Sequence, residues 1–319
     1  MDTKKAVKGL AIATGAAAGV FFLTGEAIYE GMLNRKLMLG TKNKNREIEP
    51  ELLDYYGDPD DAVKPDDWFV ASRTPVTSIV MDNGDTTFCH IFKAKEETTK
   101  WAIVIHGNSS IPRAMADQAR WFYNHGYNVL MPYMRAHGVD EHIYCSMGYK
   151  DKDYIVAWAK YICCLDPNAQ IVLLGVSMGS ATTMLTTGEK LPDNVKCAIA
   201  DCGYTSCWDE FCAQATVMAH LPGPPFMTAA NAVSKLRGNF DFKKCSPIDA
   251  VARSKTPTLF IHGDKDTFVP YYMMRPLYEA CSADKECLTV PGARHAESNV
   301  LNPELYYGKI ESFVSKYVV

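Results

Sequence analysis

The chain has 319 residues, of which 47% are apolar, and this is enough to bury one large core. Its 33 lysines and arginines and its 37 aspartates and glutamates give a formal net charge of -4 at pH 7. Because no excess of basic residues is available to bind phosphates, the composition excludes nucleic acid as a partner.

Residues 1–36 differ in composition from the rest of the chain. Lys4, Lys5 and Lys8 precede 17 consecutive uncharged residues, 9–25. Secretory signal cores have about 7 to 15 apolar residues and membrane-spanning helices about 17 to 25, so both interpretations imply membrane targeting. Since no small-x-small cleavage site follows the run, we expect an uncleaved membrane anchor. A cleaved signal segment and an amphipathic helix on a cytosolic protein are the alternatives.

The orientation of this segment is open, because basic residues flank it on both sides. Its likeness to a signal sequence favours a folded domain outside the cytoplasm. The 11 cysteines, however, are odd in number and irregularly spaced, which is not typical of a disulfide framework. They also lack the spacing of zinc ligands. We expect most of them to be buried thiols, and this keeps a cytoplasmic domain possible.

Residues 37–67 are polar and acidic and are interrupted by prolines, which predicts a connector to a folded domain over residues 68–319. This domain begins with two stretches of alternating hydrophobicity, 77–81 and 86–92, on either side of Asn83-Gly84. Asn-Gly in this position is a strong signal for a β-hairpin.

Strands and helices alternate through most of the remaining domain. The predicted strands are 101–105, 127–131, 170–174, 196–200, 258–261 and 286–290, and the predicted helices are 111–125, 149–164, 180–190, 272–281 and 303–317. Apolar strands joined to helices by short connections are typical of a parallel sheet covered on both faces. We therefore predict an α/β fold with a mostly parallel central sheet flanked by helices on both faces.

The alternation stops after the sixth predicted strand, over residues 203–255, where a proline-rich break separates two helical stretches. An insertion of this size beside a site usually forms a small helical cap. Its large apolar side chains either pack between the two helices or line a substrate pocket. The candidates for a pocket lining are Phe211, Met218, Phe226 and Met227.

The sequence Gly175-Val176-Ser177-Met178-Gly179 joins a predicted strand to a predicted helix. In a strand-turn-helix of this kind the serine occupies a sharp turn, and its hydroxyl stands above the edge of the sheet. Glycines on both sides allow the close backbone approach that the turn requires. Ser177 is therefore the candidate nucleophile.

Residues that could activate this serine follow other predicted strands. His295 is the candidate base, because a serine hydroxyl is a poor nucleophile until a neighbouring group accepts its proton. Asp264 and Asp266 follow one strand, and Asp201 ends another. We predict that Asp266 orients His295, since a loop of a few residues lets its carboxylate reach the histidine. Asp201 and Asp264 remain alternatives.

His106-Gly107-Asn108 follows the first strand of the alternating region. Acyl transfer to a serine needs N–H donors for the oxyanion that develops on the carbonyl oxygen. We assign this role to the backbone N–H groups of Asn108 and Met178, with His106 holding the turn. The chemistry needs neither a metal nor an organic cofactor, and we expect none.

Several of these motifs together resemble the α/β-hydrolase superfamily. They are Gly175-Val176-Ser177-Met178-Gly179, His106-Gly107, Arg135-Ala136-His137-Gly138, His262-Gly263-Asp264-Lys265-Asp266 with Val269-Pro270, and Arg294-His295. Within the superfamily the chain is similar to the serine aminopeptidase-like and monoacylglycerol-lipase-like branch, including bacterial members with an N-terminal membrane segment. The resemblance covers residues 68–317 and implies an α/β-hydrolase fold with a triad of Ser177, Asp266 and His295. One departure is Tyr133, where relatives usually carry an aspartate with a structural role.

The predicted function is that of a serine hydrolase that cleaves small to medium acyl or aryl esters through an acyl-enzyme. A serine peptidase or amidase is the alternative, because the same fold hosts both activities. A third alternative, of another class, is an inactive membrane-tethered binding module. The expected partners are a small-molecule ester and a membrane.

Overall fold

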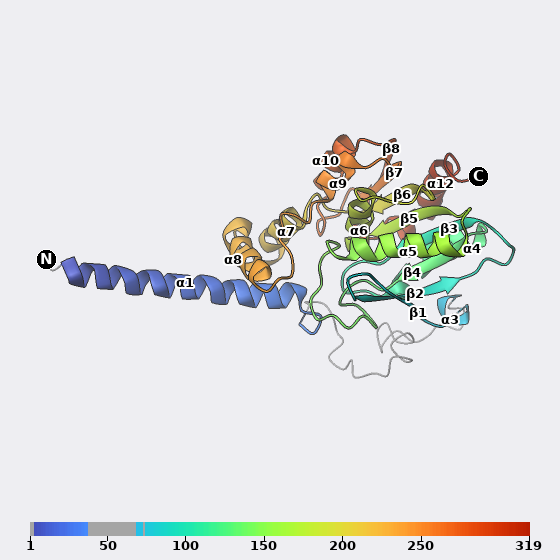
Figure 1. Cartoon of the computed structure of the whole chain (residues 1–319). Coiled ribbons are helices and arrows are strands. Elements are labelled where there is room, and N and C mark those ends of the chain that lie inside the picture. The colour runs from blue at the N-terminus through green and yellow to red at the C-terminus, as the bar shows by residue number, and fades with distance from the viewer. Residues whose placement is uncertain (1–2, 38–67, 73) are drawn as a thin grey trace.

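The computed structural model describes residues 3–37, 68–72 and 74–319 (Figure 1). For residues 3–17, 70, 218 and 219 it describes the backbone alone. The predicted connector, apart from its first residue, lies outside the described residues. The description therefore covers an N-terminal helix and the domain from Trp68 onward.

Within the described residues, eight strands form one central sheet in the order β1-β2-β4-β3-β5-β6-β7-β8. The strands are β1 (Thr77–Val80), β2 (Thr86–Phe92), β3 (Lys100–Ile105), β4 (Asn128–Pro132), β5 (Gln170–Val176), β6 (Val195–Asp201), β7 (Thr258–Gly263) and β8 (Lys285–Val290). The pairs β1–β2 and β2–β4 are antiparallel, and all the others are parallel. The predicted mostly parallel sheet is confirmed.

Helices cover both faces of the sheet (Figure 1). Alternate residues of β3 show this, since Ile103 and Ile105 pack with α5 and α6, whereas Ala102 and Val104 pack with α4 and α12. The helices of the sheet domain are α3 (Trp68–Ala71), α4 (Ala116–Asn124), α5 (Asp151–Leu165), α6 (Met178–Thr187), α10 (Met274–Ala280), α11 (Ser298–Leu301) and α12 (Pro303–Val314), with short 3-10 helices at Pro112–Met115 and Tyr271–Met273.

Three further helices follow the sixth strand, at the place where the sequence predicts a cap. They are α7 (Cys207–Ala219), α8 (Gly223–Leu236) and α9 (Pro247–Arg253). The Ser206 hydroxyl begins α7 by accepting a hydrogen bond from the backbone N–H of Asp209 at 3.0 Å. Figure 1 shows α7 and α8 at the end of the molecule where the N-terminal helix lies.

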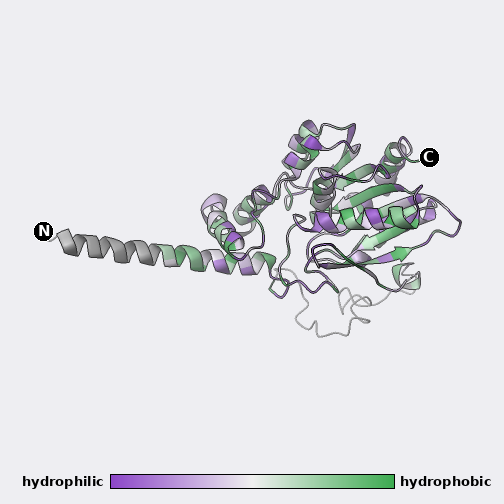
Figure 2. Cartoon of the chain, in the orientation of Figure 1, coloured by the Kyte–Doolittle hydropathy of each residue, from purple (hydrophilic) through white to green (hydrophobic). Residues whose placement is uncertain are grey.

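The N-terminal segment forms one long helix, α1 (Thr3–Leu33), whose C-terminal half packs along α8 (Figure 1). The predicted membrane anchor and the localisation derived from it are wrong, because no helix in the described part of the chain is long and apolar enough to cross a membrane. The uncharged run is rich in glycine, alanine and threonine, and α1 continues past it through Glu26 and Glu30. Figure 2 shows hydrophilic residues in this half of the helix. Tyr29 and Leu33 are fully buried against protein.

Candidate active site

Ser177 lies on the sharp turn between β5 and α6. Its backbone has φ 59° and ψ -120°, in the left-handed half of conformational space that costs energy for a residue with a side chain. The flanking glycines make the turn possible. A Cβ on Gly175 would lie 2.1 Å from the carbonyl oxygen of Gly179, and a Cβ on Gly179 would lie 2.2 Å from that of Ile105.

The structure brings Ser177, His295 and Asp266 together from three separate loops. His295 Nε2 lies 2.9 Å from Ser177 Oγ, and His295 Nδ1 lies 2.8 Å from Asp266 Oδ2. Both distances are those of hydrogen bonds. The three side chains thus form a continuous chain from a carboxylate through an imidazole to a hydroxyl.

The carboxylate of Asp266 is held by more than one donor. Its Oδ1 accepts hydrogen bonds from the backbone N–H groups of Phe268 and Val269 at 2.9 and 3.0 Å, and His262 Nε2 lies 3.2 Å from its Oδ2. Burial opposes ionisation, but the hydrogen bonds from His262 and His295 hold the pKa of Asp266 below its usual value. Asp266 is therefore a carboxylate near neutral pH. The part played by His262 is one that the sequence did not reveal.

The two alternative acids occupy different surroundings. Asp264 Oδ1 accepts a hydrogen bond from the backbone N–H of Gly292 at 2.7 Å and so holds a turn. Asp201 is buried at the end of β6, and burial raises the pKa of its carboxyl to about 6. Its backbone carbonyl accepts a hydrogen bond from the N–H of Ser177 at 2.9 Å. Within the described residues, the carboxylate bonded to His295 is that of Asp266.

His106 holds the loop after β3. Its Nε2 accepts a hydrogen bond from the backbone N–H of Met134 at 3.1 Å, so its proton is on Nδ1, which donates to the carbonyl of Gly107 at 2.8 Å. Burial lowers the pKa of His106 to about 3, and the ring is therefore neutral. Both ring nitrogens are engaged in holding backbone.

A second histidine holds the other side of the same loop. His137 Nε2 accepts a hydrogen bond from the backbone N–H of Ser109 at 3.0 Å. Asn108, which precedes this anchored residue, lines one pocket together with Ser177 and Met178. The two predicted oxyanion-hole residues thus line the same cavity as the serine.

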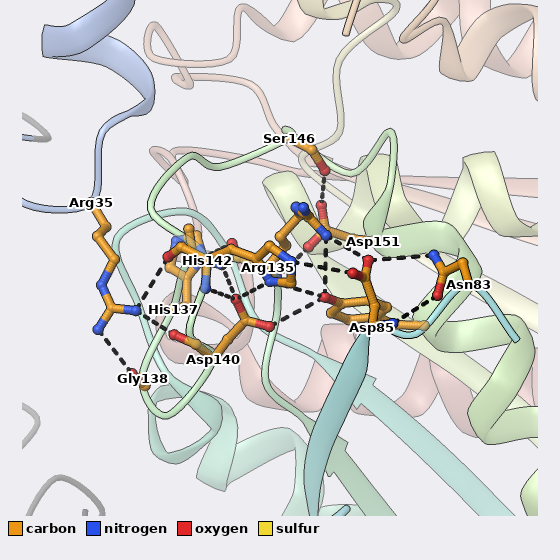
Figure 3. Close-up of polar contacts among 12 residues, drawn as sticks. Arg35, Asn83, Asp85, Arg135, His137, Gly138, Asp140, His142, Ser146 and Asp151 are labelled. Atoms are coloured by element: carbon orange, nitrogen blue, oxygen red, sulfur yellow. Dashed lines mark hydrogen bonds and ion pairs between the residues drawn. The ribbon is translucent and has the colours of Figure 1, made fainter. Parts of the chain in front are cut away.

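The loop that carries His137 is itself fixed by a network of charged side chains (Figure 3). Arg135 Nη1 lies 2.8 Å from Asp85 Oδ2, and the backbone N–H of Arg135 donates to Asp151 Oδ1 at 2.6 Å. Asp140 Oδ1 accepts from the backbone N–H of Ala136 at 2.7 Å. These contacts give the Arg-Ala-His-Gly motif a positioning role.

The cavity above Ser177 has a volume of about 340 Å³ and a mostly apolar lining. Of the four predicted pocket residues, Phe211, Phe226 and Met227 line it, and the side chain of Met218 lies outside the described residues. Lining residues that the sequence did not reveal are Ala27, Ile28, Gly31 and Met32 of α1, Glu210 and Gln214 of α7, and Phe268 and Val269 of the loop after β7.

Glu210 is an acid in this largely apolar cavity. Its side chain is buried, its Oε1 accepts a hydrogen bond from Gln214 Nε2 at 3.0 Å, and in the part of the chain that the structure describes its Oε2 has no hydrogen-bond partner. Burial raises the pKa of Glu210 to about 8. The carboxyl is therefore protonated near neutral pH, and it adds an uncharged polar group to the cavity lining.

One group of described residues has the spacing of a metal site. Ligand atoms of Cys202, Asp266 and His295 lie within 4.8 Å of one another. Asp266 Oδ2 and His295 Nδ1 are already hydrogen-bonded to each other. Burial raises the pKa of the Cys202 thiol well above its usual value. A cysteine must be a thiolate to bind a metal ion, so this set of donors does not fit a metal ion.

The sequence is similar to a known protein family and to individual proteins. The sequence profile of the Prolyl oligopeptidase family matches residues 115–318. The uncharacterised protein YqkD of Bacillus subtilis is 28% identical over 226 residues, which cover 69% of this chain and 73% of that protein. The α/β-hydrolase domain-containing protein WAV2 of Arabidopsis thaliana is 30% identical over 155 residues, or 47% of this chain and 48% of that protein.

Solved structures with the same fold include the esterase Pf2001 of Pyrococcus furiosus. It has a TM-score of 0.63 at 20% identity, over 77% of this chain and 93% of its own. The acylaminoacyl peptidase of Pyrococcus horikoshii has a TM-score of 0.56 at 16% identity, over 76% of this chain and 40% of its own. At such identities the likeness shows the fold, and the predicted α/β-hydrolase fold is confirmed. The chain therefore belongs to the Prolyl oligopeptidase family and is a serine hydrolase of the α/β-hydrolase fold.

Proposed function

We propose that this serine hydrolase cleaves carboxylic esters with small to medium acyl or aryl groups, with Ser177, His295 and Asp266 as its catalytic triad. The observation that supports this most is the distance of 2.9 Å between Ser177 Oγ and His295 Nε2 on the floor of an apolar cavity. An apolar cavity of this kind, with few polar groups near the reacting atom, suits an acyl chain.

In the proposed mechanism His295 Nε2 accepts the proton of Ser177 as Oγ attacks the ester carbonyl carbon. Asp266 keeps the other ring nitrogen protonated and stabilises the imidazolium. The backbone N–H groups of Asn108 and Met178 donate to the oxyanion of the tetrahedral intermediate. The imidazolium then protonates the leaving alcohol, which departs from the acyl-enzyme. Water, deprotonated by the same histidine, releases the carboxylic acid and restores the serine.

Amide or peptide hydrolysis is the second candidate. The family description and the likeness to an acylaminoacyl peptidase favour it. A bound peptide would need polar partners for its backbone, and the polar side chains in the cavity lining are few: Asn108, Ser177, Tyr204, Glu210 and Gln214. This lining favours an ester with an apolar acyl group.

The test is a panel of p-nitrophenyl esters and aminoacyl p-nitroanilides, run on the full chain and on Ser177→Ala. We expect kcat/KM for the best ester to exceed that for the best anilide by at least about a hundredfold. Ser177→Ala should lower turnover by roughly four to six orders of magnitude with the fold kept. A preference for anilides would establish the peptidase. Failure of the folded protein to react with a fluorophosphonate would indicate an inactive binding module.

A further inference from the structure

The C-terminal half of α1 is part of the wall of the cavity that contains Ser177. Its lining residues are Ala27, Ile28, Gly31 and Met32. Residues at these spacings share one face of a helix. Met227 of α8 and Phe211 of α7 lie in the same lining. The helix that resembles a targeting segment in the sequence thus borders the space into which a substrate must fit.

Close packing and charge hold this half of α1 against the cap. A Cβ on Gly25 would lie 2.5 Å from the carbonyl oxygen of Ala229, so the backbones of α1 and α8 touch here. Glu30 Oε1 lies 2.9 Å from Arg237 Nη1 and accepts a hydrogen bond from the Tyr144 hydroxyl at 2.7 Å. Burial opposes ionisation of Glu30, but hydrogen bonds from Asn34 and Tyr144 keep the pKa of its carboxyl below the usual value. The ion pair with Arg237 is therefore present at neutral pH.

The chain just beyond α1 is fixed as well (Figure 3). The guanidinium of Arg35 donates hydrogen bonds to the backbone carbonyls of Gly138, Asp140 and His142. The backbone N–H of Arg35 donates to the carbonyl of Ile143 at 2.9 Å. Since α1 is held at both ends of its pocket-lining stretch, this wall has a defined position.

Gly31 is the point at which the wall leaves room. A Cβ on this residue would have no heavy atom within 4 Å, and the residue lines the cavity. Glycine within a helix is less favourable than alanine, so nothing in the helix itself calls for a glycine here. We propose that α1 is the wall against which the acyl chain packs and that Gly31 determines the length of acyl group that the cavity accepts. This proposal rests on the proposed ester hydrolysis.

The test compares Gly31→Leu with Gly19→Leu in the full chain. Both changes place a better helix former in α1, and a Cβ at Gly19 also has no heavy atom within 4 Å, but Gly19 is exposed to solvent. We expect Gly31→Leu to lower kcat/KM for p-nitrophenyl decanoate by about 10- to 200-fold, the range for a clash of a methylene or more in an apolar pocket. The loss on p-nitrophenyl acetate should be at least about fivefold smaller than the loss on the decanoate, and Gly19→Leu should match the unchanged chain on both esters.

Binding is measured separately by calorimetry with decanoate and butyrate, which needs no turnover. Gly31→Leu should weaken decanoate binding by at least about tenfold and leave butyrate binding unchanged. Met32→Ala, which removes atoms instead of adding them, should raise the rate on dodecanoate relative to decanoate. It tests the wall even if Gly31→Leu fails to fold.

The outcomes separate this proposal from the proposed reaction. Equal decanoate affinities and equal chain-length profiles for Gly31→Leu and Gly19→Leu would overturn the wall. Hydrolysis of p-nitrophenyl acetate without any binding of decanoate would also overturn the wall, although the proposed reaction would stand. If the chain hydrolyses no ester, yet binds decanoate in a way that Gly31→Leu weakens, the reaction fails and the wall stands.

Discussion

Asp266 and Asp201 both lie close to the serine and histidine, but their surroundings shift their pKa values in opposite directions. Asp266 receives hydrogen bonds from two backbone N–H groups and from His295, and its pKa is lowered despite burial. Burial raises the pKa of Asp201 to about 6. In the proposed mechanism the histidine becomes an imidazolium and needs a negative charge beside it, and Asp266 is the carboxylate that is hydrogen-bonded to His295.

Asp266→Asn should therefore lower kcat by about 10⁴, because an amide at this position favours the wrong tautomer of His295. Asp201→Asn should keep kcat within a few fold, since its carboxylate does not meet the histidine. The measurement is kcat on p-nitrophenyl butyrate, with circular dichroism as the control for folding. A folded Asp201→Asn without turnover, beside an active Asp266→Asn, would reverse the assignment.

Glu210 links one buried proton to the pH dependence of stability. Its pKa is about 8 in the folded chain, against an ordinary value of 4.5, so the folded state holds the proton more tightly than the unfolded state. The resulting stabilisation is fully present below pH 4.5 and is lost as the pH rises through 8. Glu210→Gln carries no titrating proton. The melting temperature of Glu210→Gln minus that of the unchanged chain should therefore rise by roughly 5 °C between pH 5 and pH 9. A difference that is constant across this range would contradict the buried protonated carboxyl.

At the scale of elements, residues of α1, α7 and α8 line the cavity, whereas the proposed catalytic side chains lie on loops that follow the strands. Gly31 of α1, Phe211 of α7 and Met227 of α8 all lie in the lining. None of these residues belongs to the turn that carries Ser177. Substitutions at these lining residues can therefore change the size of the cavity without changing the strained turn that carries Ser177.

Arg237, at the end of α8, forms ion pairs with Glu26 and Glu30 of α1, and its guanidinium lies over the ring of Tyr29. An exposed ion pair contributes less than about 1 kcal/mol, so the loss of two pairs and a cation–π contact should raise the population with α1 detached by roughly tenfold. Arg237→Ala should therefore increase the rate of chymotrypsin cleavage after the buried Tyr29 by about that factor.

The matched control is Lys235→Ala, which removes a basic residue of α8 that pairs with Asp241. We expect its cleavage rate after Tyr29 to equal that of the unchanged chain. Equal rates in Arg237→Ala and Lys235→Ala would show that these ion pairs do not hold α1.

On the scale of the whole molecule, the sheet brings the proposed catalytic residues together at one edge. Ser177, Asp266 and His295 follow the carboxyl ends of β5, β7 and β8, which are parallel strands of the one sheet with β6 between β5 and β7. In parallel sheets these ends meet at a common edge, where ligands usually bind. Loops far apart in sequence therefore converge because of strand direction alone.

This is why the sequence could predict that these three residues of the candidate site lie close together. The strand pattern and the glycines beside Ser177 are local signals, and strand direction then brings His295 and Asp266 to the same edge. The packing of α1 against α8 could not be predicted from the local sequence, because α8 lies about 200 residues further along the chain. An apolar helix face also has the same residue pattern whether it packs against lipid or against protein. The burial of Glu210 could not be predicted either, because an acidic residue in the first turn of a helix usually faces solvent.

The packing of the whole domain also determines which thiols can react. All 11 cysteines are free, and seven of them are buried: Cys89, Cys145, Cys197, Cys202, Cys207, Cys245 and Cys281. Burial keeps these seven thiols from contact with solvent, and it raises the pKa of the Cys197 thiol to about 12, so that this thiol is not ionised at pH 8. Only Cys164 and Cys287 are exposed among the described residues.

We therefore expect a chromogenic disulfide reagent at pH 8 to modify two thiols per chain rapidly, and all 11 after unfolding in guanidinium chloride. Replacing both Cys164 and Cys287 with serine should abolish the rapid phase and leave esterase turnover unchanged, because neither residue lies in the cavity lining. The partly exposed Cys163 and Cys212 should react more slowly, at rates that the double replacement does not alter. Rapid modification of more than four thiols in the native chain would mean that the sheet and the cap are packed less closely than the structure shows, since the buried thiols lie in both.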